Sequence, residues 1–135
     1  GIIGPYARIR PDSKIGKNTQ IGNFVEVKNS YIGSNTKINH LTYVGDSEIG
    51  DNVIIGAGSV TCNFDGHVTH KTFIDDNVFI GSGVLLVAPI NVGRSATIGS
   101  GSVITQDVPP KKLTLARSKQ ITIDNWKGPK KNNNT

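Results

Sequence analysis

The sequence predicts an all-β chain that winds into a parallel β-helix of hexapeptide repeats, a triangular prism of between five and six coils. Two observations predict this fold. Aliphatic side chains recur every six residues, and the composition has 16 glycines and 36% hydrophobic residues but only 6% aromatic ones. A layered core usually contains more aromatic bulk, whereas a disordered chain contains fewer aliphatic residues. A coil of short, glycine-rich strands accounts for both features.

The six-residue period extends over most of the chain. Its steps shorten to five residues before Ile32 and Ile49, and a longer interruption follows Thr61. Of the 17 positions only Thr61 is not Ile, Leu or Val, and the set is Ile3, Ile9, Ile15, Ile21, Val27, Ile32, Ile38, Val44, Ile49, Ile55, Thr61, Ile74, Ile80, Leu86, Val92, Ile98 and Ile104. Helices do not produce this spacing, and repeated hexads are typical of a parallel β-helix with three hexads per coil.

Each hexad is expected to form one short strand and one turn. The long aliphatic side chain points inward, and a small residue four positions later fills the corner. A glycine that often follows the aliphatic residue is expected to supply backbone freedom at the turn. We expect the β-helix over 1–104, with residues 61–73 leaving it as a loop, and a C-terminal cap and basic tail over 105–135.

Composition also narrows the cellular setting and the partners. The net charge of +5 suggests an anionic partner, while the lack of interleaved aromatics argues against nucleic acid. No apolar run reaches the roughly 20 residues of a membrane span. The single Cys62 excludes an internal disulfide and suits a reducing compartment, so we expect a cytoplasmic protein. Because the chain has no Met, we expect it to be a piece of a longer protein.

The repeat length determines which residues stack on one another. A coil takes 18 residues, or 17 with a five-residue step, and stacked residues lie about 4.8 Å apart. Arg10 and Lys28 both replace the usual glycine and lie 18 residues apart, so we expect them to stack. Stacked cations repel unless an anion lies between them, which indicates a phosphate or carboxylate site. Two solvated basic residues on an exposed ridge are the alternative.

A second column begins at His40, and the residues that stack after it are Ala57, Ser82 and Ser100. These small residues predict a narrow track of about 14 Å, suited to a rod-shaped ligand such as an extended pantetheine arm. Backbone N–H groups at Ala57 and Ser82 would serve the amides of such a ligand and a developing oxyanion.

Polar neighbours distinguish His40 from an ordinary structural histidine. Arg10, Glu26 and Lys28 lie on its N-terminal side, and Glu26 stacks with Tyr43 near the same corner. This set combines a base, a carboxylate, a hydroxyl and two cations. We therefore interpret His40 as a candidate catalytic residue.

Two further histidines, His67 and His70, lie in the loop that breaks the period. Three histidines brought together at a subunit contact would form a zinc site, as in hexapeptide-repeat carbonic anhydrases. The three-residue spacing is weak evidence for such a site, so we expect exposed loop histidines and no metal. Cys62 has no activating base nearby in the sequence and is expected to be a buried free thiol.

The sequence resembles a known family in four stretches: NFVEVKN at 23–29, NHLTYVGDSEIGDNVIIGAG at 39–58, TCNFDG at 61–66 and VAP at 87–89. They are similar to the acetyltransferase domain of the bacterial bifunctional N-acetylglucosamine-1-phosphate uridylyltransferase/glucosamine-1-phosphate N-acetyltransferase. The likeness runs collinearly to about Trp126. It implies a left-handed β-helix, a homotrimer with active sites between subunits, and a missing N-terminal nucleotidyltransferase domain.

The resemblance also implies the reaction. Acetyl-CoA would N-acetylate glucosamine 1-phosphate to N-acetylglucosamine 1-phosphate, on the pathway to UDP-N-acetylglucosamine for cell-wall peptidoglycan and lipopolysaccharide. The family's general base matches His40, with Glu26 orienting the imidazole. Sugar-phosphate contacts match Arg10, Lys28, Tyr43 and, less well, Ile54. Contacts to acetyl-CoA match Ala57, Asn63, Phe64, Ser82, Ser100 and Arg117, the last reaching in from another protomer.

Four positions depart from the family pattern, since Ile54 replaces an Asn, Phe64 a Tyr, Ser100 an Ala and Thr69 a Lys. The change at Ile54 puts one sugar contact in doubt. Three alternatives therefore stay open at this point. They are another hexapeptide acyltransferase with a different amine, a zinc carbonic anhydrase of the same fold, and a structural solenoid that binds an anionic polymer.

Overall fold

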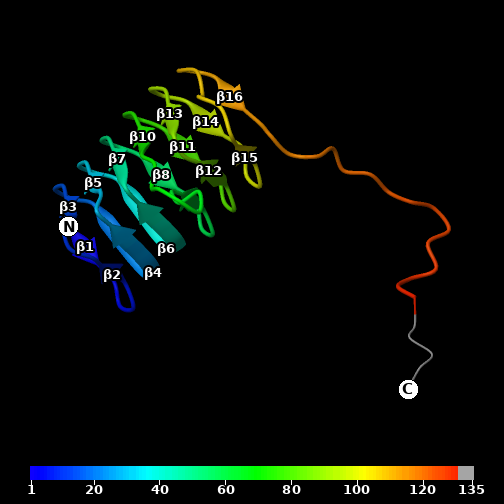
Figure 1. Cartoon of the computed structure of the whole chain (residues 1–135), viewed down its shortest axis with the longest axis horizontal. Helices are drawn as coiled ribbons and strands as arrows, with labels where there is room; N and C mark the ends of the chain where they lie inside the picture. The colour runs from blue at the N-terminus through cyan, green and yellow to red at the C-terminus, as the bar shows by residue number, and fades with distance from the viewer. Residues whose placement is uncertain (131–135) are drawn as a thin grey trace.

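The computed structural model describes residues 1–130 as short parallel strands that stack in rungs along one axis (Figure 1). The N-terminal strands lie at one end of the stack, and the segment after the last strand runs away from the other end (Figure 1). This arrangement confirms the predicted all-β class, and the coil is a left-handed parallel β-helix. None of the described residues belongs to a helix with the length and apolarity that crossing a membrane requires.

The described strands, in chain order, are β1 (Ile2–Ile3), β2 (Arg8–Ile9), β3 (Lys14–Ile15), β4 (Gln20–Lys28), β5 (Tyr31–Ile32), β6 (Lys37–Gly45), β7 (Ser47–Ile49), β8 (Ile54–Ile55), β9 (Val60–Cys62), β10 (Thr72–Ile74), β11 (Phe79–Ile80), β12 (Leu85–Val87), β13 (Ile90–Val92), β14 (Thr97–Ile98), β15 (Val103–Ile104) and β16 (Leu113–Thr114). Strands β3, β5, β7, β10 and β13 form a five-stranded sheet. The other strands form one eleven-stranded sheet that covers two sides of the prism, because β4 and β6 each continue around a corner.

Strand pairing confirms the register that the hexads predict. Ile21 pairs with Ile38, 17 residues later, and Ile55 pairs with Ile80 across the loop. The core is therefore a stack of aliphatic residues, and those buried in it include Ile21, Val27, Ile32, Ile38, Val44, Ile49, Ile55, Ile74, Ile80, Leu86, Val92, Ile98 and Ile104. In the first coil of the chain, Ile3 is 54% exposed.

Small hydroxyl residues at the corners donate hydrogen bonds to backbone carbonyls of the next coil. Thr19 Oγ1 donates to the Gly33 carbonyl at 2.6 Å, and Thr36 Oγ1 donates to the Gly50 carbonyl at 2.9 Å. Ser59 Oγ makes the equivalent hydrogen bond, of 3.0 Å, to the Gly81 carbonyl. These hydroxyls link each coil to the next and are themselves satisfied, as a buried polar group must be.

The expected reason for the hexad glycines is wrong. Glycines such as Gly16 and Gly22 do not have positive φ, and most of the left-handed turns are formed by other residues, chiefly Asn and Asp. A Cβ on Gly16 would lie 2.6 Å from the Gly33 carbonyl carbon, and one on Gly22 would overlap the Asn39 carbonyl. The repeat therefore requires glycine because adjacent coils approach closely there, and not because the turn needs unusual torsion angles.

The coil also continues past the expected boundary at residue 104. Val108 bridges Val92, and β16 pairs with β14 in parallel register. The predicted cap thus begins as a further partial coil. Of the predicted basic tail, Lys131 and the residues after it lie outside the described residues.

Candidate functional site

The predicted column at His40 is confirmed by strand pairing. Because Ile38 pairs with Ile55, Ile55 with Ile80 and Ile80 with Ile98, the residues that stack after His40 are Ala57, Ser82 and Ser100. On the other side His40 pairs with Asn23, which the sequence reasoning missed although the same repeat length identifies it.

His40 itself is exposed and borders a hollow of about 300 Å³ that Gln20, Asn23 and Asn39 also line. Within residues 1–130 no hydrogen bond joins its imidazole to another side chain. Amide side chains that can donate or accept surround it, and both ring nitrogens are available to a ligand.

At the corner beside this column, the coils from the N-terminal end to the one that carries His40 have bulky side chains. They are Tyr6, Phe24 and Leu41, all more than half exposed although large and apolar. The rings of Tyr6 and Phe24 stack with their centroids 5.4 Å apart. The N-terminal half of this corner is therefore a raised ridge.

Glycine occupies the same corner in the next three coils, at Gly58, Gly83 and Gly101. Positive φ alone does not explain these glycines, because the chain accepts other residues at such turns, among them Asn18, Asn35, Asn52 and Asn77. A Cβ on Gly83 or Gly101 would contact nothing within 4 Å, so packing does not require glycine there either. The effect of these glycines is therefore to leave the corner without side chains, so that nothing projects over the small-walled track beyond His40.

The outward row on the adjoining side of the prism changes at the same coil. Its residues stack in register across β2, β4, β6, β9, β12 and β15. They are Arg8, Glu26 and Tyr43 on the N-terminal side, followed by Val60, Leu85 and Val103. A polar surface therefore adjoins His40 on one side and an apolar surface on the other.

The predicted stacking of Arg10 on Lys28 is confirmed, since Ile9 pairs with Val27. Each cation, however, has a carboxylate partner. Arg10 Nη1 lies 3.3 Å from Glu26 Oε2, and Lys28 Nζ lies 3.5 Å from Asp46 Oδ2. Glu26 was expected to orient the imidazole, but in this structure its hydrogen bond is to Arg10. Its role toward His40 stays a prediction.

Asp46 is the functional candidate that sequence reasoning missed. It is 7% exposed and accepts hydrogen bonds from Asn29 at 2.9 Å and Asn63 at 2.7 Å. Burial alone raises the pKa of this carboxyl, but these hydrogen bonds and the Lys28 charge outweigh burial and hold the pKa of Asp46 below its usual value. Asp46 is therefore a buried carboxylate at neutral pH.

One expectation is not met at the C-terminal end of the track. The Ser82 N–H, proposed as a donor to the ligand, already donates to Ser100 Oγ at 3.0 Å. Within the chain, Arg117 lies at the end of the track, where Nη1 donates to the Ser100 carbonyl at 2.7 Å. That Arg117 reaches in from another protomer stays a prediction. A cation thus lies where the small-walled column ends.

The loop that interrupts the repeat is shorter than predicted, because β9 and β10 leave only residues 63–71 outside the strands. Asn63 at its base is buried, whereas Phe64 is 63% exposed and bridges Thr69 across the loop. Cys62 is a half-buried free thiol. His67 is exposed, and His70 Nε2 lies 2.7 Å from Asp65 Oδ2.

Hydrogen bonds within the loop make its structure sensitive to acid. The Val68 N–H, the His70 ring and the His67 N–H together lower the pKa of Asp65 to about 2. A lowered pKa means that these hydrogen bonds are complete above the ordinary value near 4 and are lost as the pH falls through about 2. We expect the NMR shift of the Val68 amide proton to titrate near pH 2 and not to titrate in Asp65→Asn. A midpoint near 4 would contradict this geometry.

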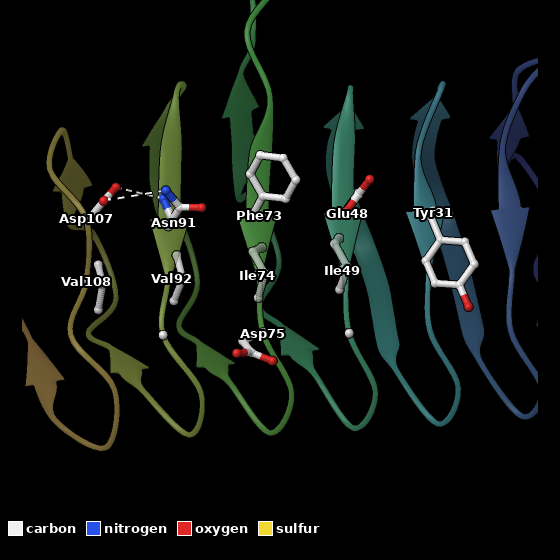
Figure 2. Close-up of a pocket in the computed structure, with 12 residues that line it drawn as sticks. Tyr31, Glu48, Ile49, Phe73, Ile74, Asp75, Asn91, Val92, Asp107 and Val108 are labelled. Carbon is white, nitrogen blue, oxygen red and sulfur yellow. Dashed lines mark hydrogen bonds between the residues drawn. The ribbon is translucent and has the colours of Figure 1, made fainter.

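Two other features lie outside the column at His40. Ile54 is 41% exposed in an outward row with Lys37 and Phe79, on the side of the prism that leads to the His40 corner. A hollow of about 520 Å³ lies on the five-stranded sheet, from which Tyr31 and Phe73 project (Figure 2). That hollow is on a different side of the prism from His40.

Within residues 1–130 no group of three or more possible metal ligands occurs.

Comparison with known proteins agrees with the geometry. Residues 1–64 match the family model described as the GMPPB C-terminal domain, and residues 71–106 match the hexapeptide repeat of succinyl-transferase. "Bifunctional protein GlmU" from Nitrosomonas europaea is 58% identical over 98% of this chain and 29% of its own length. The protein of that name from Chromobacterium violaceum is 57% identical over 96% of this chain. The chain spans less than a third of these curated relatives.

Solved structures share the fold. The acetyltransferase domain of PglB from Neisseria gonorrhoeae, in complex with acetyl coenzyme A, matches with a TM-score of 0.74 at 25% identity, covering 82% of this chain and 52% of that one. The perosamine N-acetyl transferase of Caulobacter crescentus matches with a TM-score of 0.76 at 21% identity over 91% of this chain and 58% of that one. The chain therefore belongs to the family of the C-terminal, hexapeptide-repeat acetyltransferase domain of the bifunctional GlmU proteins.

Proposed function

We propose that the chain transfers the acetyl group of acetyl-CoA to the amine of glucosamine 1-phosphate, with His40 as general base. One observation carries this proposal. Beyond the coil that contains His40, glycines replace the bulky side chains of the corner ridge, and the outward row changes from polar to apolar residues. A thin, partly apolar cofactor arm fits one side of the imidazole, and a polar, anionic sugar fits the other.

The reaction needs a neutral amine, a base and a thioester. The amine nitrogen attacks the thioester carbonyl carbon, the C–N bond forms, and His40 accepts the proton that the nitrogen loses. The tetrahedral intermediate then collapses, the C–S bond breaks, and coenzyme A leaves as the thiol after it gains a proton. An imidazole titrates near neutral pH and suits this role.

The track and Arg117 together define the site proposed for acetyl-CoA. The pantetheine arm would lie along Ala57, Ser82 and Ser100, with Asn63 and Phe64 beside it, and Arg117 would pair with a phosphate of the nucleotide end. The track is open to solvent in one chain, so a second copy would complete its wall. We propose a homotrimer with the active sites between subunits, as the family resemblance implies.

The proposed setting follows from the same chemistry. The free thiol of Cys62 suits the reducing cytoplasm, where acetyl-CoA is available. The product, N-acetylglucosamine 1-phosphate, would supply UDP-N-acetylglucosamine synthesis. No metal takes part in the proposed mechanism, so chelators should leave the rate unchanged.

Calorimetry with acetyl-CoA, followed by a thiol-release assay, tests the function. We expect binding of acetyl-CoA and rapid thiol release with glucosamine 1-phosphate. Binding without release on any amino sugar would overturn the assignment of the reaction, and absence of binding would favour a structural solenoid.

The cation pair provides a separate prediction about the acceptor. Arg10→Ala and Lys28→Ala should each raise KM for glucosamine 1-phosphate about tenfold and leave KM for acetyl-CoA nearly unchanged, since a charge-assisted hydrogen bond is lost. Steady-state kinetics with each substrate varied in turn measures this. Arg94→Ala, which removes an exposed cation at another corner, is the matched control. Unchanged KM in both variants would show that the phosphate does not bind there.

A second candidate is acetylation of a different amino sugar. It is favoured by Ile54, whose apolar side chain cannot donate the hydrogen bond of the amide expected at that position. A rate on unphosphorylated or nucleotide-linked amino sugars that exceeds the rate on glucosamine 1-phosphate would support it.

A further inference from the structure

Asp46 lies at the centre of a network that links the proposed phosphate site to the loop. It occupies the corner between β6 and β7 in a left-handed conformation, with φ of 49°. Its carboxylate is buried, and a buried charge is costly unless hydrogen bonds satisfy it. Three side chains from two segments of the chain do so, namely Lys28, Asn29 and Asn63.

The carboxylate determines which way its partners point. An ionised carboxylate only accepts hydrogen bonds, so Asn63 must present its NH₂ group to Asp46 Oδ2, 2.7 Å away. The same NH₂ group lies 3.2 Å from Tyr43 Oη and donates its second hydrogen there. The Tyr43 oxygen is thus an acceptor toward Asn63, and its own hydrogen remains free to donate outward.

Lys28, like Tyr43, keeps hydrogens that can be donated to a ligand. Its ammonium group lies 3.5 Å from Asp46 Oδ2, and a single contact leaves two of its three hydrogens for another acceptor. Lys28 is about one-third exposed, whereas Asp46 lies behind it at 7%. The solvent-exposed surface consequently carries hydrogen-bond donors, whereas the carboxylate that orients them is buried and does not face a bound anion.

We propose that Asp46 is a positioning residue that holds Lys28 and, through Asn63, Tyr43 as outward donors for the phosphate of the acceptor sugar. This inference rests on the proposed function. Asn63 also lies at the base of the loop, where its carbonyl accepts the His70 N–H at 2.6 Å. The network therefore joins the acceptor site to the loop that flanks the cofactor site.

The test is the preference for a phosphorylated acceptor in Asp46→Asn. We expect the ratio of kcat/KM for glucosamine 1-phosphate to kcat/KM for glucosamine, at saturating acetyl-CoA, to fall about tenfold. A merely structural role would lower both rates and leave the ratio unchanged. Asp51→Asn is the control for the loss of a corner carboxylate, because Asp51 Oδ1 accepts a hydrogen bond from the Ser34 N–H at a corner distant from the site.

Asn63→Leu keeps the test valid if Asp46→Asn does not fold. It leaves the carboxylate in place but breaks the link to Tyr43, and the same fall in preference is expected. An active wild-type chain with an unchanged ratio in the folded variants would overturn this inference alone. A wild-type chain without acetyl transfer would overturn the proposed function, and this inference with it.

Discussion

Replacing His40 with alanine is expected to lower the turnover number for acetyl transfer by about 10²–10⁴-fold, the usual contribution of a general base. Binding of acetyl-CoA should persist, because the track beyond His40 consists of other side chains and of backbone. The fold should persist too, since the imidazole is exposed and is not hydrogen-bonded to another side chain within residues 1–130. Thiol release and calorimetry on the same preparation measure the two effects separately.

His67→Ala is the control for the loss of a histidine. His67 is exposed in the loop and its ring has no place in the proposed mechanism. Its removal should leave turnover within about twofold of wild type, as is usual for a surface substitution. Normal turnover in His40→Ala would remove His40 from the mechanism, and loss of acetyl-CoA binding in that variant would assign it a binding role instead.

Replacing Gly83 with asparagine is expected to weaken acetyl-CoA binding about tenfold to a hundredfold. The φ of Gly83 is 65°, and Asn18 and Asn77 adopt nearly the same angle elsewhere in the chain, so asparagine should be tolerated by the backbone. The new side chain would instead project into the open corner beside the track, which is otherwise free of atoms within 4 Å. Filling occupied space typically costs 1–3 kcal/mol, which sets the expected loss.

Asn77→Gly serves as the reverse control. It changes a left-handed corner residue on another edge of the prism, so it should alter stability slightly and acetyl-CoA affinity not at all. Calorimetry measures affinity, and thermal unfolding measures whether both variants fold. Unaltered affinity in Gly83→Asn would show that the ligand does not follow the open corner.

Much of the architecture could be predicted because a repeat converts sequence distance into position. The pairing of Ile38 with Ile55 follows from a coil of 17 residues, and the column after His40 follows from that pairing. The stacking of Arg10 on Lys28 is equally a matter of counting. Seven extra residues in the loop displaced the register without destroying it, because the coils on both sides keep the same spacing.

Hydrogen bonds between side chains could not be predicted from the repeat length alone. Asp46 and Asn63 are 17 residues apart and therefore stack, but the repeat does not show that both side chains are buried or that the amide donates to the carboxylate. The hydrogen bond from the Ser82 N–H to Ser100 Oγ depends on a rotamer. The pairing of Glu26 with Arg10, where an imidazole partner had been expected, also depends on which rotamer brings opposite charges together.

The sequence by itself determined the coil, the inward aliphatic stack and the columns on which His40, Arg10 and Lys28 lie. These features depend on backbone pairing, which the six-residue period sets over residues 1–104 outside the loop. Only the tertiary structure decided that the hexad glycines serve close approach between coils, that Arg117 donates to the Ser100 carbonyl, and that the buried Asp46 carboxylate accepts hydrogen bonds from Asn29 and Asn63. Such features arise where side chains from different coils meet in three dimensions, and their geometry is not periodic.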